Sequence, residues 1–286
     1  MEVRRLSIQA LHTKNPIRKE FQLDDDFGWD DGLICGGRVQ VLILPEPRCY
    51  IDAFRKATTD GARGVLRYSL KTGNVSFKSM SDDLNESEIL ALTKRREVLD
   101  DINFYEPIMP AEQLIVFGGG HIGKEVARIG AFLEFEVTVV DDREEFLSEE
   151  RLPFVKQRIC DDNENFAKKL REETKNDYLC EETYVCIVTR GHRNDSKVLR
   201  HLIGRPWGYL GMIGSKRKRE VIKKQMLEEG WCTKEEFEQV RSPMGLDIGA
   251  ESVPEIAISI CADLAQARAQ RRGGILARCE QKKMLY

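Results

Sequence analysis

The stretch Leu114–Lys124, near the middle of the chain, constrains the fold more than any other segment. It reads Leu-Ile-Val-Phe-Gly-Gly-Gly-His-Ile-Gly-Lys, so an apolar run leads into a Gly-x-Gly-x-x-Gly pattern. This order predicts a strand, a tight turn and a helix. Gly118 would permit the turn, Gly120 would let the backbone approach a pyrophosphate, and Gly123 would let helix and strand touch.

A second apolar run, Val137–Val140, ends in Asp141, 23 residues after Gly118. An acid at this distance can bond the 2′-hydroxyl of a ribose, whereas Arg143 beside it could accept a 2′-phosphate. The sequence therefore does not separate NAD from NADP, and a dinucleotide without nicotinamide is a third alternative. Together these features predict a Rossmann dinucleotide-binding fold. The competing interpretation is a glycine-rich turn that binds no ligand.

The order of the expected strands and helices along the chain predicts an α/β protein of two domains. Residues 1–110 include a strand at 39–44 and a hairpin at 64–78, which indicates a smaller, mixed α/β domain that leans toward strands. From 111 to 270 strands and helices alternate, which is typical of a parallel, Rossmann-like sheet. Residues 271–286 hold a glycine pair and several basic residues, and we expect them to form a mobile tail.

Charge and cysteine usage narrow the cellular setting. The formal net charge is −3 and no apolar run reaches the length of a membrane span, so we expect neither a nucleic-acid nor a membrane partner. The first residues are too polar for a signal peptide, and the eight cysteines include no Cys-x-x-Cys pair. We therefore expect a cytoplasmic protein with free thiols, in which Cys186 and Cys261 belong to the core.

A second phosphate signal lies at Gly211–Arg219, where Gly214 and Ser215 open a predicted helix. Its first turn carries four basic residues, which the positive end of the helix dipole repels. A bound anion would reverse this repulsion. The Ser215 hydroxyl, the Lys216 ammonium and the helix amides would then hold a phosphate at the carboxyl end of a strand. The alternative is a solvated basic face.

Cys35 differs from the other thiols because it precedes Gly36 and Gly37. Glycines keep a thiol open to a bulky partner, and their amides, with Arg38, could lower the pKa of the thiol toward a thiolate that binds metal or sulfur. The alternative is a buried cysteine at the entry of a strand.

The chain offers no convincing pair of a general acid and a general base. His121 lies in the glycine turn and His192 in a loop after a strand, so both could face one crevice or simply serve the loops. Asp195 and Asp247 are loop acids with the same two interpretations.

Six motifs, in this order along the chain, resemble the XdhC/CoxI family of xanthine dehydrogenase accessory proteins. The resemblance covers about residues 24 to 270. Its motifs are Leu33–Val41, Glu106–Ile108, Leu114–Gly123, Val137–Arg143, Gly211–Ser215 and Ser242–Glu251. It implies an N-terminal XdhC-type domain and a C-terminal Rossmann domain. It also implies a cofactor chaperone that binds the molybdenum cofactor, as molybdopterin or with an added nucleotide. Such a protein shields the cofactor during sulfuration by a cysteine desulfurase and helps insert it into a xanthine dehydrogenase-type molybdenum hydroxylase.

The resemblance also assigns site residues. Cys35 matches the family's Cys-Gly-Gly cysteine and is expected to contact the cofactor, including its metal. The other residues that match the family's motifs are Gly118, Gly120, Gly123, Asp141, Gly214, Ser215 and Lys216. Together with their neighbours Gly36, Gly37, Gly119, His121 and Arg143, they are the cofactor-binding residues that we expect.

The sequence departs from the family in two places. Fewer residues than usual precede Cys35, so the first domain is either abbreviated or completed by a second chain in a homodimer. The family's Thr-His-Asp appears here as Thr189–His192, with the sequence Thr-Arg-Gly-His.

Our leading hypothesis is thus a maturation factor without catalytic activity. An NAD(P)-dependent oxidoreductase and a nucleotide sensor that neither transfers a cofactor nor catalyses remain the alternatives, because both would use the same glycine turn.

Overall fold

The structure is a computed structural model that describes residues 2–23, 37–60, 62–109, 111–173 and 181–283. It divides into two compact units, Met1–Pro110 and Ala111–Tyr286, which we call the N-terminal and C-terminal units. Cys35 and Gly36, the expected cofactor contacts, lie outside the described residues.

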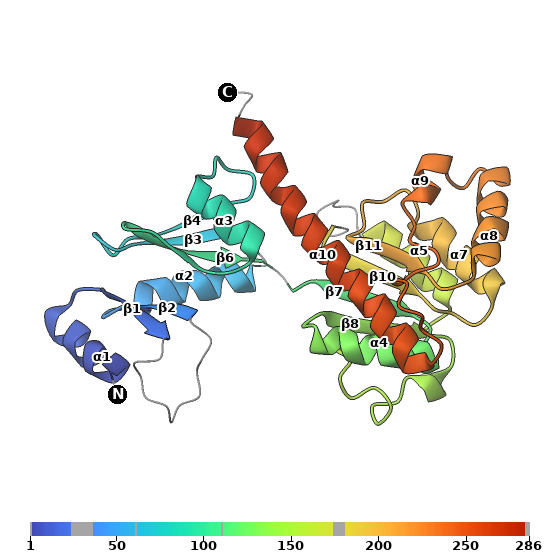
Figure 1. Ribbon diagram of the computed structural model, residues 1–286, viewed down its shortest axis with the longest axis horizontal. Coiled ribbons are helices and arrows are strands. Elements are labelled where there is room, and N and C mark those ends of the chain that lie inside the picture. Colours follow the sequence, from blue (N-terminus) through green and yellow to red (C-terminus); the bar gives the residue numbers. More distant parts are fainter. Residues whose placement is uncertain (1, 24–36, 61, 110, 174–180, 284–286) are drawn as a thin grey trace. The chain divides into compact units, whose positions relative to one another are not determined.

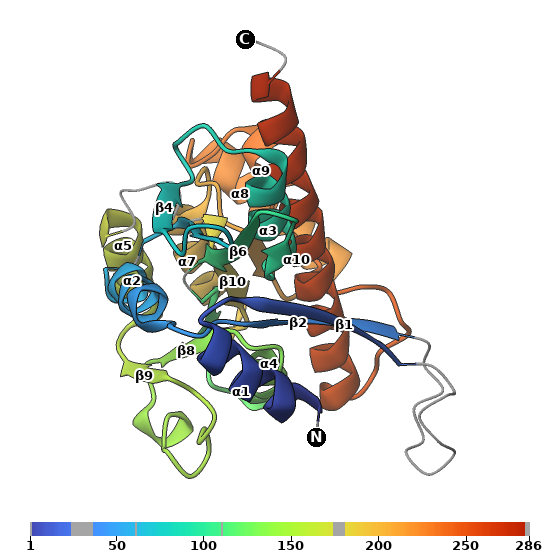
Figure 2. The same cartoon turned by 90° about the vertical axis from the view of Figure 1, so that its left-hand side faces the viewer.

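The N-terminal unit combines two antiparallel sheets with three helices. Strands β1 and β2 pair with each other, and the second sheet has the order β4-β3-β6-β5. Figure 2 shows α1 lying along the ribbon formed by β1 and β2. The elements are α1 (Glu2–Thr13), β1 (Ile17–Leu23), β2 (Gly37–Ile43), α2 (Arg48–Thr59), β3 (Gly64–Ser69), β4 (Val75–Ser79), α3 (Glu86–Lys94), β5 (Val98–Leu99) and β6 (Asn103–Ile108).

The hairpin expected in this unit is present as β3 and β4. Helices α1 and α3 and strands β1, β5 and β6 were not predicted. In α1 only Leu6 and Ala10 are buried, too few apolar residues to produce a clear helical period. Helix α3 begins at a capping box formed by Asn85 and Glu88.

The C-terminal unit contains a five-stranded parallel sheet in the order β11-β10-β7-β8-β9. This confirms the predicted α/β class with a Rossmann-like sheet. Its elements are β7 (Gln113–Phe117), α4 (His121–Phe132), β8 (Glu136–Asp141), the 3-10 helix η2 (Glu144–Phe146), β9 (Gln157–Cys160), α5 (Asn163–Glu173), β10 (Thr183–Ile187), α7 (His192–Leu202), β11 (Tyr209–Met212), α8 (Lys216–Glu228), α9 (Lys234–Glu238) and α10 (Val253–Lys283).

Helices cover both faces of this sheet. Helices α4 and α10 lie together on one face (Figure 1), where Val126 and Leu264 pack in one buried cluster with Val116 of β7. Helices α5, α7 and α8 supply a second cluster on the other face. Cys186 and Cys261 are buried in the first cluster, as expected for core thiols. Among the described residues, no helix combines the length and apolar character needed to cross a bilayer.

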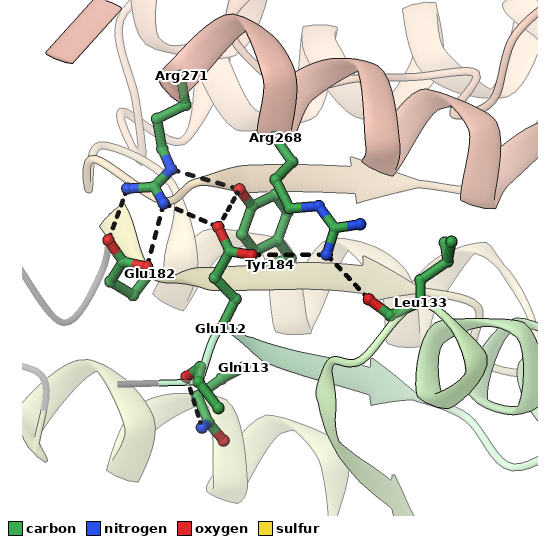
Figure 3. A network of polar contacts seen from close by, with 8 residues as sticks. Glu112, Gln113, Leu133, Glu182, Tyr184, Arg268 and Arg271 are labelled. Atoms are coloured by element: carbon green, nitrogen blue, oxygen red, sulfur yellow. Dashed lines mark hydrogen bonds and ion pairs between the residues drawn. The ribbon is translucent and has the colours of Figure 1, made fainter. Parts of the chain in front are cut away.

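A buried polar network fastens α10 to the sheet (Figure 3). The guanidinium of Arg271 donates to Glu182 at 2.8 and 3.0 Å, to Glu112 at 2.9 Å and to the Tyr184 hydroxyl at 3.3 Å. Arg268 lies 3.5 Å from the second oxygen of Glu112. Both glutamates are only 4% exposed. The two arginines therefore supply counter-charges to buried carboxylates at the amino ends of β7 and β10.

The described part of residues 271–286 is helical, and the mobility that we expected for this tail stays a prediction. Helix α10 continues through Gly273 and Gly274 to Lys283. A glycine inside a helix costs about 1 kcal/mol, but the residues after Gly274 are mostly good helix formers. Arg271, two residues before Gly273, pairs with Glu112 and Glu182 and so anchors the helix.

Candidate functional site

The glycine turn joins β7 to α4 with room for side chains at only one of its three motif positions. Gly118 has a φ of +110°, and a Cβ there would lie 2.5 Å from the carbonyl oxygen of Val188. A Cβ at Gly123 would lie 1.8 Å from the carbonyl oxygen of Gly118, whereas one at Gly120 would meet nothing within 4 Å. The N-terminus of α4, capped by Gly120, is thus open to a ligand whose negative charge its amides favour.

Asp141 ends β8 beside this turn and is 1% exposed. Its Oδ2 accepts the amide of Gly119 at 2.6 Å and Nη2 of Arg143 at 2.9 Å. Its Oδ1 accepts the backbone N–H and Nε of Arg143 at 3.0 and 2.8 Å. These four bonds use all the lone-pair positions of a carboxylate. The expected bond to a ribose hydroxyl stays a prediction, and it would have to replace one of them.

The charges at this strand end are held in place by aromatic contact. Burial raises the pKa of Asp141, but Arg143 and the two amides lower it more, so the pKa lies below its usual value and the carboxylate is charged. The guanidinium of Arg143 lies 3.9 Å from the ring centroid of Phe146, and that of Arg151 lies 5.0 Å from it. Both distances suit a cation–π contact.

The second turn, Gly214–Ser215, caps α8. The Ser215 hydroxyl accepts the amide of Lys218 at 3.2 Å and keeps its own proton for another acceptor. Of the four basic residues expected to attract an anion, Arg219 is neutralised by two glutamates. Lys216 and Arg217 are exposed, and within the described part of the chain they make no ion pair. These two cations remain available for an anion.

A buried ion pair that the sequence did not predict connects this turn to the first turn of α7, so Asp195 lies in a helix and not in a loop as expected. Asp195 is 0% exposed and accepts the hydroxyl of Thr189 at 2.6 Å and its amide at 3.2 Å. Its other oxygen pairs with the ammonium of Lys218, which also donates to the carbonyl of Ile213 at 2.9 Å. Burial raises the pKa of Asp195, and Lys218 opposes that rise. The sequence showed only that each residue follows a predicted strand, and the structure shows that these two strands are neighbours.

The structure gathers most of the expected site at one edge of the sheet. Strand order changes direction between β7 and β10, and ligands of open α/β sheets bind at the carboxyl ends of the strands beside such a point. His121 is exposed as the first residue of α4. Gly37, in the other unit, is the first residue of β2. The residues at the carboxyl edge are Gly118, Gly119, Gly120, His121, Gly123, Asp141, Arg143, Gly214, Ser215 and Lys216.

The described residues contain no group of three His, Cys, Asp or Glu side chains that could together hold a metal ion. The expected metal contact of Cys35 falls outside these residues and stays a prediction.

Comparison with known families decides the identity of this fold. Residues 114–264, more than half of the chain, match the family described as the XdhC Rossmann domain. The chain belongs to the XdhC family. This confirms the resemblance that the six sequence motifs predicted.

Three similar proteins show how far the similarity extends. The chain is 29% identical over 164 residues to the uncharacterized protein YqeB of Escherichia coli K12, which covers 57% of this chain and 29% of YqeB. It is 26% identical over 269 residues to a protein of Bacillus subtilis described as a probable xanthine dehydrogenase component, covering 90% of this chain and 77% of that protein. A crystal structure described as a xanthine dehydrogenase from Bacillus halodurans aligns with a TM-score of 0.70 at 21% identity, over 94% of this chain and 80% of the other. At this identity it supports the fold alone.

Proposed function

We propose that this XdhC-family protein binds the molybdenum cofactor and assists its sulfuration and insertion into a xanthine dehydrogenase-type molybdenum hydroxylase. The name of the Bacillus subtilis relative supports an association with a xanthine dehydrogenase. The observation that carries the proposal is the pair of anion-binding turns at one sheet edge, one at Gly118–Gly120 and one at Ser215.

The residues at this edge fit a phosphate-bearing cofactor. The space beside Gly120 admits a pyrophosphate against the amides of α4, and Lys216 and Arg217 add two exposed positive charges at α8. When bound, the cofactor would supply the redox chemistry that its partner hydroxylase uses. The residues of this chain would bind and orient it through its phosphates. A cysteine desulfurase as second partner, a homodimer, a contact from Cys35 and a cytoplasmic location belong to the same proposal.

Co-purification tests the proposal directly. The protein is purified from cells with and without cofactor biosynthesis, and bound molybdopterin is assayed after release. We expect molybdopterin only in the first preparation, and a clear reduction in the Cys35→Ala variant. Absence of molybdopterin from the wild-type protein overturns the proposal, and full binding by Cys35→Ala removes the role of Cys35.

The same preparations separate the two alternatives, since both depend on the same glycine turn. Saturable binding of NADH or NADPH with turnover of a carbonyl substrate would identify an oxidoreductase. A change in affinity for a hydroxylase partner on adding either nucleotide, without any bound pterin, would identify a sensor.

Replacing both Lys216 and Arg217 by alanine should weaken binding of pyrophosphate by about 10-fold, since each lost charge-assisted contact contributes more than a neutral one. Titration calorimetry at two salt concentrations measures this, and the variant should also show the smaller salt dependence. Lys224→Ala, on the same helix and paired with Glu228 at 3.7 Å, is the matched control. Equal affinities in all three proteins would exclude a phosphate site at α8.

A further inference from the structure

The N-terminal unit contains a cavity of about 500 Å³ that is lined by residues of this unit. This volume lies within the range of about 300 to 1,000 Å³ that is typical of small-molecule sites. Its walls combine aliphatic and aromatic side chains with the polar residues Gln40, Glu97 and Glu106. The lining residues used below are Tyr50, Phe104 and Glu106.

Strand register explains why a carboxylate stands in an aromatic cavity. In β6, Glu106 pairs with Leu66 and Phe104 with Tyr68, so these side chains share one face of the sheet. Tyr50 of α2 lies against that face, with its ring centroid 5.9 Å from Phe104 and 6.2 Å from Tyr68. Glu106 is therefore held next to flat rings instead of facing open solvent.

Two polar groups of this cavity lack the partners that burial demands. Glu106 is half-buried, and among the described residues its carboxylate accepts no hydrogen bond and makes no ion pair. Burial accordingly raises the pKa of Glu106. The hydroxyl of Tyr50 is buried and, within the same described set, also has no partner. Polar groups left in this state cost free energy that a ligand with matching donors would recover.

We propose that this cavity binds a planar nitrogen heterocycle that presents two adjacent N–H donors to Glu106 and stacks on Phe104 and Tyr50. A carboxylate accepts two parallel N–H bonds in a fixed geometry, and flat rings stack on aromatic side chains. The 2-amino-4-oxopyrimidine ring of a pterin presents such an edge. The inference rests on the proposed function in naming the pterin, because that ring is part of the molybdenum cofactor. Guanine presents the same pair of N–H donors and is the competing ligand for this cavity.

Fluorescence titration of the full chain, purified from cells that do not make the cofactor, tests the proposal with free pterin as the probe. We expect saturable one-to-one binding with a dissociation constant below about 1 mM. Lumazine, which carries an oxo group in place of the 2-amino group, should bind at least about 10-fold more weakly. No binding of pterin at about 1 mM, or equal binding of lumazine, overturns the inference. Tighter binding of guanosine than of pterin overturns the pterin assignment.

Two variants connect this binding to the cavity. Glu106→Gln should weaken pterin binding by about 10- to 100-fold, because the amide oxygen carries no charge and the NH₂ group faces the ligand's donors. Tyr50→Phe, which removes only the unpartnered hydroxyl, should weaken it less. Thermal unfolding verifies that both variants fold. Glu46→Gln, which alters an exposed glutamate paired with Lys14 at 3.3 Å, should leave pterin binding unchanged.

The outcome separates this inference from the proposed function. Free pterin carries no phosphate, so the variant with alanine at both Lys216 and Arg217 should bind it normally. Suppose that the cofactor co-purifies with the protein but Glu106→Gln leaves pterin binding unchanged. This result would overturn the cavity as the pterin site and leave the proposed function standing. If pterin binding depends on Glu106 but no cofactor co-purifies, the cavity stands as the pterin site and the proposed function is overturned.

Discussion

Alanine in place of Gly123 is expected to destabilise the C-terminal unit by about 3 kcal/mol or more. The added Cβ would stand 1.8 Å from the carbonyl oxygen of Gly118, so β7 and α4 would have to move apart, and overpacking of this kind typically costs about 1 to 3 kcal/mol even where only side chains shift. Urea unfolding followed by circular dichroism measures the loss. A variant as stable as the wild type would show that helix and strand are not in this contact.

Gly120→Ala is the matched control, since a Cβ there meets nothing within 4 Å. Its stability should stay within about 1 kcal/mol of the wild type. Its affinity for pyrophosphate should nevertheless fall by at least about 10-fold, because the added methyl group occupies the space beside the backbone where the pyrophosphate would bind. Equal stability losses at Gly120 and Gly123 would contradict the geometry of the turn.

Removal of the Arg271 guanidinium is the second change with a large expected effect. Arg271→Ala should cost about 3 to 5 kcal/mol, because it leaves the buried carboxylates of Glu182 and Glu112 without their main counter-charge. The unfolding midpoint in urea reports the loss. Combining Arg271→Met with Glu182→Gln should recover much of it, since Glu112 keeps Arg268 at 3.5 Å as its counter-charge.

A surface arginine provides the comparison for this network. Arg128→Ala, on α4, breaks an exposed pair with Glu125 at 2.8 Å and should cost less than about 0.5 kcal/mol. If Arg271→Ala costs no more than Arg128→Ala, α10 is not fastened through the network in Figure 3.

The features that the sequence predicted are those that a few neighbouring residues determine. The turn at Gly118–Gly123 and the Ser215 cap of α8 follow from local spacing, because each depends on contacts within a few positions. The core positions of Cys186 and Cys261 followed in the same way from apolar periodicity.

The contacts that escaped prediction join residues far apart in the chain. Asp195 meets Lys218 only because β10 and β11 are neighbours, and Glu112 meets Arg271 across 159 positions. Such pairs depend on strand order and helix packing, which no local pattern specifies. The same holds for the cavity at Glu106, where sequence showed a motif without a chemical reason for it.

Asp141 carries a consequence for selectivity. Since the protein's own donors already fill its acceptor positions, a sugar hydroxyl that bonds there only exchanges one charge-assisted bond for another. The end of β8 therefore gives little preference for one nucleoside over another. Under the proposed function, discrimination between nucleotides would have to come from groups outside this strand end.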